Sequence, residues 1–384
     1  MNFAPLKDFL DYYMPMLGIP GSDTVIYKRH EEIFRHQSGI DSRRLRTPIQ
    51  KDALYNLYSC SGAVTCIAAM QLVERGEMLV TDPLYAYIPE FRDVRIGLKK
   101  ENCDTLDLAL PSQPITIKHL FTMTSGIGDC SGHPEVKAAI DANSGQADTV
   151  EVVKSFAKIP LVSDPGSTYV DGLSLDVLGA VIEIVSGQKL SEYVQNNIFE
   201  PLGMKDSSFR ADTSSYSRFA SQYSLDNALR DAVEISSYRC DRRLGLKYES
   251  GGFGITSTVD DFAKFADALA CGGVSKNGER IISEYALDIM TRNALDAADF
   301  NKRSFGTKAG YGFGYGFNVN MTPETYGNLA PVGEFFLDGE KNSFFSCDRY
   351  SGVSIFHTQN LSDLNRIVIP RIRNLVFSCL GEKG

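Results

Sequence analysis

A serine at the start of a long apolar segment is the first residue in this chain that could do covalent chemistry. The segment reads SCSGAVTCIAAMQLVERGE, and Ser59 stands where an apolar helix is expected to begin. A serine hydroxyl attacks an acyl carbon usefully only when a neighbouring group removes its proton. One helical turn later, where such a base would stand, the residue is Gly62. Two interpretations stay open: a nucleophile that uses another base, and a helix N-cap, a position that serine often occupies.

The bulk composition limits the classes of function. The chain has 384 residues, 43% of them hydrophobic, which suits one large composite domain or two closely packed ones. Its net charge of -9 argues against nucleic acid or an anionic membrane surface as a partner. No run reaches the roughly 20 apolar residues of a membrane span, and no signal peptide is recognisable. We expect a cytoplasmic protein that binds a neutral or cationic small molecule; its oligomeric state is not indicated.

Residue types that bind metals are scattered along the chain. The eight cysteines lack the short paired spacings of zinc or iron sites, and several lie in apolar segments where a thiol acts as a small hydrophobic group. One histidine, His119, belongs to the scaffold-like segment ITIKHLFTMTSG. The other four show no metal or triad signature: His30, His36, His133 and His357. We therefore predict neither a metal nor another cofactor.

Strand patterns lie near both chain ends, and helix patterns lie between them. Residues 22–39 and 343–360 each alternate around a short turn, which predicts two antiparallel hairpins. Residues 361–380 have apolar side chains at helical spacing. Helices are also predicted over 173–187 and 259–273, each followed by glycine. The expected fold is α+β, with an antiparallel sheet built from both chain ends, flanked by helices and interrupted by a mostly helical insertion.

The same patterns predict how the chain divides into domains. Residues 1–85 and 305–384 are expected to form a discontinuous sheet domain, and residues 86–304 a mostly helical domain. We expect the active-site cleft to lie between the two.

The stretch LYSCSGAVTCIAAMQLVERGEMLVTDPLYAYIPEF resembles the nucleophile helix of the serine β-lactamase and penicillin-binding-protein superfamily. It is most similar to the β-lactamase-related serine hydrolases and esterases of class C architecture. Four further segments agree in order and spacing: ITIKHLFTMTSGIG, DPGSTYVDGLSLDVLGAVIEIVSG, NIFEPLGMKDSSF and ESGGFGITSTVDDFAKFADAL. The resemblance covers about residues 20–360. It implies a β-lactamase/transpeptidase-like fold and hydrolysis or acyl transfer on a small ester or amide.

The resemblance also implies which residues form the site. Ser59 matches the family nucleophile, but Gly62 replaces the lysine of Ser-x-x-Lys. The family's catalytic tyrosine falls on Asp171 in PGSTYVDGLSLDVLG, a string that also brings Tyr169 to the pocket. The family's oxyanion hole uses the backbone N–H of the nucleophile and one from the strand that reads GEFFLDGEKNS here. The remaining residues that the resemblance places at the pocket are Phe253, Phe336, Leu337, Glu340, Lys341, Asn342 and Ser343.

Several of these positions allow two interpretations. Asp171 either caps the helix that begins near Leu173 or acts as a general base whose pKa is raised by an apolar pocket. Lys341 either forms a solvated pair with Glu340 or, if desolvated, engages a substrate as an amine. Gly62 either makes room for a ligand or marks the loss of a dispensable lysine.

Three functions follow from these alternatives. The first is a serine hydrolase in which Ser59 works with Asp171 as a substitute base. The second is a rebuilt pocket in which Asp171 abstracts a proton or Lys341 engages a carbonyl. The third is a binding protein without catalysis. The literal Ser-x-x-Lys sequence SFAK, Ser155 to Lys158, is not a rival site because no apolar helix follows it, and it is interpreted as a surface helix end.

Overall fold

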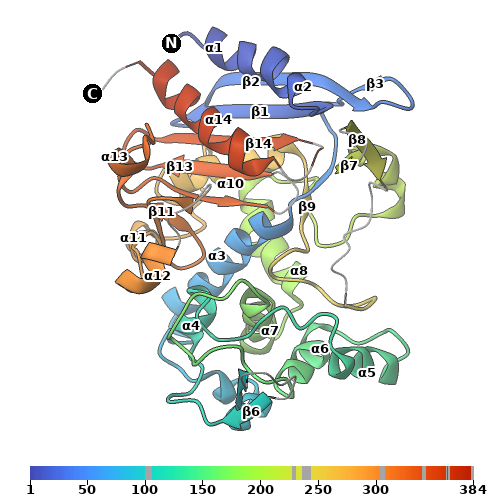
Figure 1. Cartoon of the computed structure of the whole chain (residues 1–384), viewed down its shortest axis with the longest axis vertical. Coiled ribbons are helices and arrows are strands. Elements are labelled where there is room, and N and C mark those ends of the chain that lie inside the picture. The colour runs from blue at the N-terminus through green and yellow to red at the C-terminus, as the bar shows by residue number, and fades with distance from the viewer. Residues whose placement is uncertain are drawn as a thin grey trace.

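A computed structural model shows how the predicted elements assemble (Figure 1). It describes residues 1–99, 106–226, 231–235, 244–302, 308–339, 343–359, 361 and 364–381. The sheet occupies the upper half of the view, helices α4 to α7 lie in the lower half, and both termini lie at the top.

The main sheet has eight antiparallel strands in the order β10-β11-β12-β13-β14-β1-β2-β3. The predicted hairpin over 22–39 is β1 with β2, and the hairpin over 343–360 is β13 with β14. The two hairpins lie side by side in the sheet because β1 pairs with β14. The prediction of an antiparallel sheet from both chain ends is confirmed. The strands are β1 (Gly21–Lys28), β2 (Glu31–Ser42), β3 (Thr47–Pro48), β10 (Tyr311–Phe313), β11 (Asn318–Asn320), β12 (Phe335–Asp338), β13 (Phe344–Asp348) and β14 (Val353–Gln359).

Three two-stranded ladders lie outside this sheet. They are β4 (Tyr55–Asn56) with β9 (Thr256–Ser257), β5 (Ile96–Lys99) with β6 (Leu106–Ala109), and β7 (Gln222–Asp226) with β8 (Asp231–Ile235). The first ladder matters for the site, because β4 leads directly into the turn that carries Ser59.

The helices confirm the predicted pattern. The helix expected over 173–187 is α7, which ends at the left-handed Gly187, and the helix expected over 361–380 is α14. The α-helices are α1 (Ala4–Asp8), α2 (Met14–Met16), α3 (Ser61–Glu74), α4 (Ile117–Phe121), α5 (Pro134–Ala142), α6 (Thr149–Phe156), α7 (Ser174–Ser186), α8 (Leu190–Val194), α9 (Glu200–Leu202), α10 (Val259–Ala270), α11 (Glu284–Met290), α12 (Ala297–Lys302), α13 (Pro323–Tyr326) and α14 (Asn365–Cys379).

Two apolar cores cover the two faces of the main sheet. Successive strand residues point to opposite faces, so Phe344 joins the core under α1 and α14, while Phe345 joins the larger core that contains α3, α7 and α10. The pair Ile355 and Phe356 divides in the same way. Helix α14 crosses in front of the strands and α10 lies behind them (Figure 1).

Helix α10 packs on β1, β13 and β14, although it belongs to the segment 86–304 that we expect to form a helical domain. The domain boundaries themselves stay a prediction. Within the part of the chain that the structure describes, we find no helix with both the length and the hydropathy to cross a bilayer.

Candidate active site

Ser59 sits in a short 3-10 turn, Tyr58–Cys60, between β4 and α3. Helix α3 begins at Ser61, its N-cap residue is Cys60, and no side chain caps it. The N-cap interpretation of Ser59 is therefore wrong. The Ser59 side chain is half-buried and lines a cavity, which leaves its hydroxyl available to a small molecule.

The backbone before Ser59 is strained. Tyr58 has φ +48°, in the left-handed region that costs a non-glycine residue about 1–2 kcal/mol. Met123, which lines the same cavity, has φ +56°. Both residues are buried. Strain of this kind persists only where surrounding packing enforces it, and it is frequent at functional sites.

The cavity has a volume of about 430 Å³, within the usual range for small-molecule sites. Strands β10 to β12 form one side, and the segments around Met123, Tyr169 and α7 form the other. Its lining residues are Ser59, Met123, Asp129, Tyr169, Asp171, Gly172, Leu175, Gly252, Phe253, Lys308, Phe313, Gly316, Asn318, Leu337, Asp338 and Gly339.

Gly62 lies on the first turn of α3 and does not itself line the cavity. A Cβ atom at Gly62 would come within 2.5 Å of Leu175 Cδ1. Leu175 is 8% exposed and does line the cavity, so its side chain occupies the space that a longer side chain at position 62 would enter. Gly62 therefore lies behind the lining residue Leu175 and not in the lining itself. That its missing side chain makes room for a ligand stays a prediction.

Asp171 lines the cavity and is exposed. Helix α7 begins at Ser174 and its N-cap residue is Leu173, with no side-chain cap, so the capping interpretation of Asp171 is wrong. The Asp171 side chain is exposed and is not enclosed by the apolar pocket that we expected around it. The catalytic role of Asp171 stays a prediction.

The segment that carries Asp171 is held in place by Asp299. One Asp299 oxygen accepts from Thr168 Oγ1 at 2.6 Å, and the other accepts from the backbone N–H of Tyr169, also at 2.6 Å. Burial raises the pKa of Asp299, but hydrogen bonds from Thr168, Lys302 and Tyr169 outweigh burial and leave the pKa below its usual value. The Tyr169 ring packs edge-on against the Phe313 ring, with the two ring centroids 5.2 Å apart. Tyr169 lines the cavity as predicted.

Strand β12 divides the predicted pocket residues between two faces. Leu337 lines the cavity, as does the half-buried Phe253 opposite. Phe336 points the other way, with the Arg373 guanidinium 4.4 Å from its ring centroid. The prediction that Phe336 lines the pocket was wrong because neighbouring strand residues face opposite sides.

The segment after β12 accounts for the remaining predictions. Glu340, Lys341 and Asn342 lie outside the described residues. Ser343 is buried, and its hydroxyl donates to Thr358 Oγ1 at 3.1 Å, so this side chain does not line the cavity. The Ser343 carbonyl accepts a hydrogen bond from the Gly339 N–H at 2.6 Å, which joins the end of β12 to the start of β13.

Charged residues that the sequence analysis did not single out also line the cavity: Asp129, Asp338 and Lys308. Together with Asp171 they make three acidic residues and one basic residue among the described lining residues. Asp338 directly follows Leu337 at the end of β12, and this position in the sequence could have identified it as a candidate pocket residue. The charge balance favours a neutral or cationic ligand.

Neither the neighbouring Cys60 nor Ser155 of the SFAK motif competes with Ser59 as a nucleophile. Burial raises the pKa of the Cys60 thiol well above its usual value, and the negative charge of Asp338 raises it further. This thiol is therefore a poor nucleophile. Ser155 is buried in the last turns of α6, and Lys158 lies just beyond that helix. Neither Ser155 nor Lys158 lines the cavity, and the motif lies at a helix end as predicted, although only Lys158 is at the surface.

An antiparallel sheet from both chain ends, beside a serine that precedes a buried helix, is the β-lactamase/transpeptidase-like architecture. The chain belongs to the beta-lactamase family, whose model matches residues 6–374. It is 28% identical to esterase EstB of Burkholderia gladioli over 381 residues, which cover 93% of this chain and 90% of the esterase.

Two solved structures show the same fold. One is EstCE1, a hydrolase with promiscuous acyltransferase activity, with a TM-score of 0.78, 21% identity and 98% of both chains covered. The other is unliganded simvastatin synthase (LovD) from Aspergillus terreus, with a TM-score of 0.80, 20% identity and 99% of both chains covered.

Proposed function

We propose that this protein is a serine hydrolase that forms an acyl-enzyme on Ser59 from a small neutral or cationic ester or amide. The observation that carries the proposal is the presentation of Ser59: a strained Tyr58 places the next residue at the wall of a cavity of about 430 Å³. Membership in the beta-lactamase family and likeness to an esterase support the same reaction class.

In the proposed reaction, Ser59 Oγ attacks the acyl carbon and Asp171 takes the hydroxyl proton. The proton then passes to the leaving alcohol or amine, and water or a second alcohol releases the acyl group from Ser59. The family lysine is replaced by Gly62, and a positioned base is typically worth about 10²–10⁴ in rate. Turnover is therefore expected to be slow unless Asp171 replaces that base fully.

The charge of the cavity limits the substrate. Three acidic residues and one basic residue are among the described residues that line the cavity, a balance that disfavours an anionic group. A neutral acyl group with a neutral or cationic leaving group avoids this repulsion, and Leu175, Phe253 and Phe313 offer apolar contact.

Covalent labelling tests the proposal. The purified chain is incubated with a phosphonyl probe and with an activated acyl ester, and intact mass spectrometry counts the adducts. We expect one adduct on the parent and none on Ser59→Ala. Ser155→Ala, the serine of the literal SFAK motif, is the matched control and should label like the parent. Asp171→Asn should slow acylation by about 10²-fold or more.

Two results would reject parts of this proposal. Equal labelling of the parent and Ser59→Ala would exclude Ser59 as the nucleophile. Substrate turnover that survives in Ser59→Ala but disappears in Asp171→Asn would instead favour a rebuilt pocket in which Asp171 leads the chemistry.

A second candidate function, ligand binding without turnover, is favoured by one observation. Leu175 fills the space beside Gly62, so no base from α3 accompanies Ser59. Calorimetry with a panel of small esters and amides distinguishes the two functions, since a binding protein would show affinity with no product formed. Product formation that depends on Ser59 would exclude this second candidate.

A further inference from the structure

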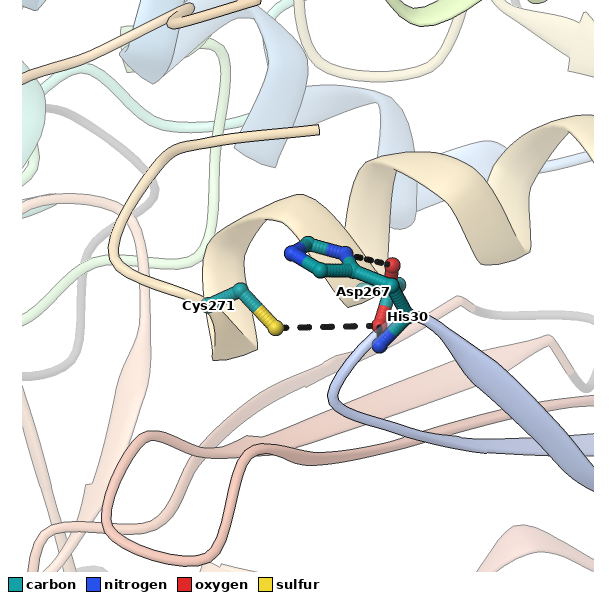
Figure 2. A group of neighbouring side chains, drawn as sticks. All are labelled: His30, Asp267 and Cys271. Atoms are coloured by element: carbon teal, nitrogen blue, oxygen red, sulfur yellow. Dashed lines mark hydrogen bonds and ion pairs between the residues drawn. The ribbon is translucent and has the colours of Figure 1, made fainter. Parts of the chain in front are cut away.

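A second group of reactive side chains lies where the β1–β2 turn meets the end of α10. Figure 2 shows His30 from the turn facing Asp267 of α10, with Cys271 at the end of that helix beside them. His30 and Asp267 are 237 positions apart in the sequence. None of these residues lines the Ser59 cavity.

The donor atoms of this cluster converge. His30 Nδ1 lies 2.7 Å from Asp267 Oδ2, and the His30 backbone N–H donates to Asp267 Oδ1 at 3.0 Å. Cys271 Sγ lies 3.8 Å from the same Oδ1 atom. One ligand atom from each of the three side chains lies within 4.8 Å of the other two.

The backbone fixes these positions before any ligand arrives. Arg29 and His30 have φ +50° and +71°, the two consecutive left-handed residues of a tight hairpin turn, so the direction of His30 is set by the turn. Asp267 and Cys271 are four residues apart and therefore lie on the same side of α10. Asp267 is 4% exposed, and His30 and Cys271 are half-buried.

We propose that His30, Asp267 and Cys271 bind a divalent transition metal, with Zn²⁺ the best match. Imidazole nitrogen, carboxylate oxygen and thiolate sulfur are the zinc ligands of proteins, at about 2.0–2.3 Å from the metal. A tetrahedral ion separates its sulfur and oxygen ligands by about 3.5 Å, close to the observed 3.8 Å. The nitrogen–oxygen pair, now at 2.7 Å, must open by about 0.7 Å, which the half-buried His30 ring permits.

The surroundings supply access and a fourth ligand position. A separate cavity of about 530 Å³ is lined by His30 and Cys271, so an ion can enter from it and keep a water or another exogenous ligand there. Three arginines also line this cavity: Arg29, Arg280 and Arg349. They oppose a bare cation, but the metal with one thiolate and one carboxylate is neutral overall. Arg349 is in addition paired with Asp288 and Glu284.

The proposed metal would tie the β1–β2 turn to α10, which packs on the sheet through β1, β13 and β14. The site is independent of the chemistry at Ser59, because the two cavities share no lining residue. It also differs from our expectation that the histidines take no part in metal binding, an expectation that rested on sequence spacing alone.

Cobalt substitution tests this proposal directly. The purified full chain is freed of metal with a chelator and titrated with Co²⁺, and the near-ultraviolet thiolate-to-cobalt charge-transfer band is recorded. We expect one Co²⁺ per chain with this band, and its displacement by Zn²⁺. Cys271→Ser should abolish the band, and His30→Gln should weaken Zn²⁺ binding at least about tenfold, as loss of even an outer-shell partner does.

Cys379→Ser is the matched control, because Cys379 is another described thiol, at the end of α14, and its loss should leave the band intact. His30→Gln changes an exposed turn, so it keeps the test valid even if a substitution at the buried Asp267 prevents folding. A parent protein without the charge-transfer band, or a band that persists in Cys271→Ser, would overturn the proposal.

Discussion

The two faces of strand β12 differ in what lies against them. On the α14 face, Phe336 lies beneath Arg373, and Arg373 Nε pairs with Glu334 Oε1 at 3.1 Å with both side chains almost fully buried. Glu334 also accepts from Tyr311 at 2.7 Å. On the opposite face, Leu337 borders a cavity that Ser59 also lines. One face packs against the buried Arg373 of α14, and the other borders the cavity.

This difference shows that the unusual string GEFFLDGEKNS is not one block of pocket residues. Its Phe336 serves stability, whereas Leu337 and Asp338 belong to the cavity. The predictions below separate the two faces, because changes on the α14 face should alter stability and changes on the cavity face should alter activity.

The largest effect is expected on the α14 face from Arg373→Met. This change leaves the Glu334 carboxylate buried without its cation, and breaking a buried pair in this way costs about 3–5 kcal/mol. Urea unfolding measures the loss. The double variant Arg373→Met with Glu334→Gln should recover part of it, since no charge is then left unpaired. A loss no larger than that of an exposed pair would contradict the assigned role of this face.

His357 of β14 lies on the same side of the sheet, where its ring is near Phe344. We expect it to make the free energy of unfolding depend on pH. Burial lowers the pKa of His357 to about 4, against an ordinary value of about 6.5. The unfolded chain therefore binds a proton first as the pH falls. The contribution of the neutral His357 to the free energy of unfolding is complete above pH 6.5. It is lost as the pH drops from 6.5 to 4, by about 1.4 kcal/mol per pH unit or about 3 kcal/mol in all.

Urea unfolding of the parent and of His357→Gln at several values of pH isolates this contribution. The parent should lose stability more steeply across the window, because the variant has no imidazole to protonate. Parallel curves for the two proteins would show that His357 does not titrate as its burial implies.

On the cavity side, restoring the family's lysine and catalytic tyrosine should raise activity. The double variant Gly62→Lys with Asp171→Tyr supplies these two residues, but a Cβ atom at position 62 would lie 2.5 Å from Leu175 Cδ1. We therefore expect the double variant to gain little and the triple variant with Leu175→Ala to gain on the order of 10²-fold on an activated ester. Initial rates measure the gain, and Leu175→Ala alone is the control. A double variant as active as the triple one would mean that Leu175 does not block the base.

The smallest effect is expected from Lys158→Ala. Lys158 pairs with Glu135 at 3.7 Å, and both side chains are exposed, so stability should change by less than about 1 kcal/mol. Labelling of Ser59 should be unchanged, because Lys158 does not line the cavity. Slower labelling in this variant would reopen SFAK as part of a site.

Much of the fold could be predicted because it depends on local pattern. The alternation over 22–39 and 343–360 gave both hairpins, and the helical spacing over 173–187 gave α7 with its glycine end. Part of the cavity followed from motifs, including Ser59, Tyr169 and Leu337. The face of Phe336 was not predicted correctly, since a motif match does not say which way each strand residue points.

The sequence by itself determined the sheet from both chain ends, the apolar helix after Ser59, and the replacement of a family lysine by Gly62, because these depend on residue type and short-range periodicity. Only the tertiary structure decided that Leu175 occupies the space beside Gly62, and that His30 meets Asp267 and Cys271. Those contacts join segments more than a hundred residues apart, and their geometry depends on how whole elements pack, which no local pattern records.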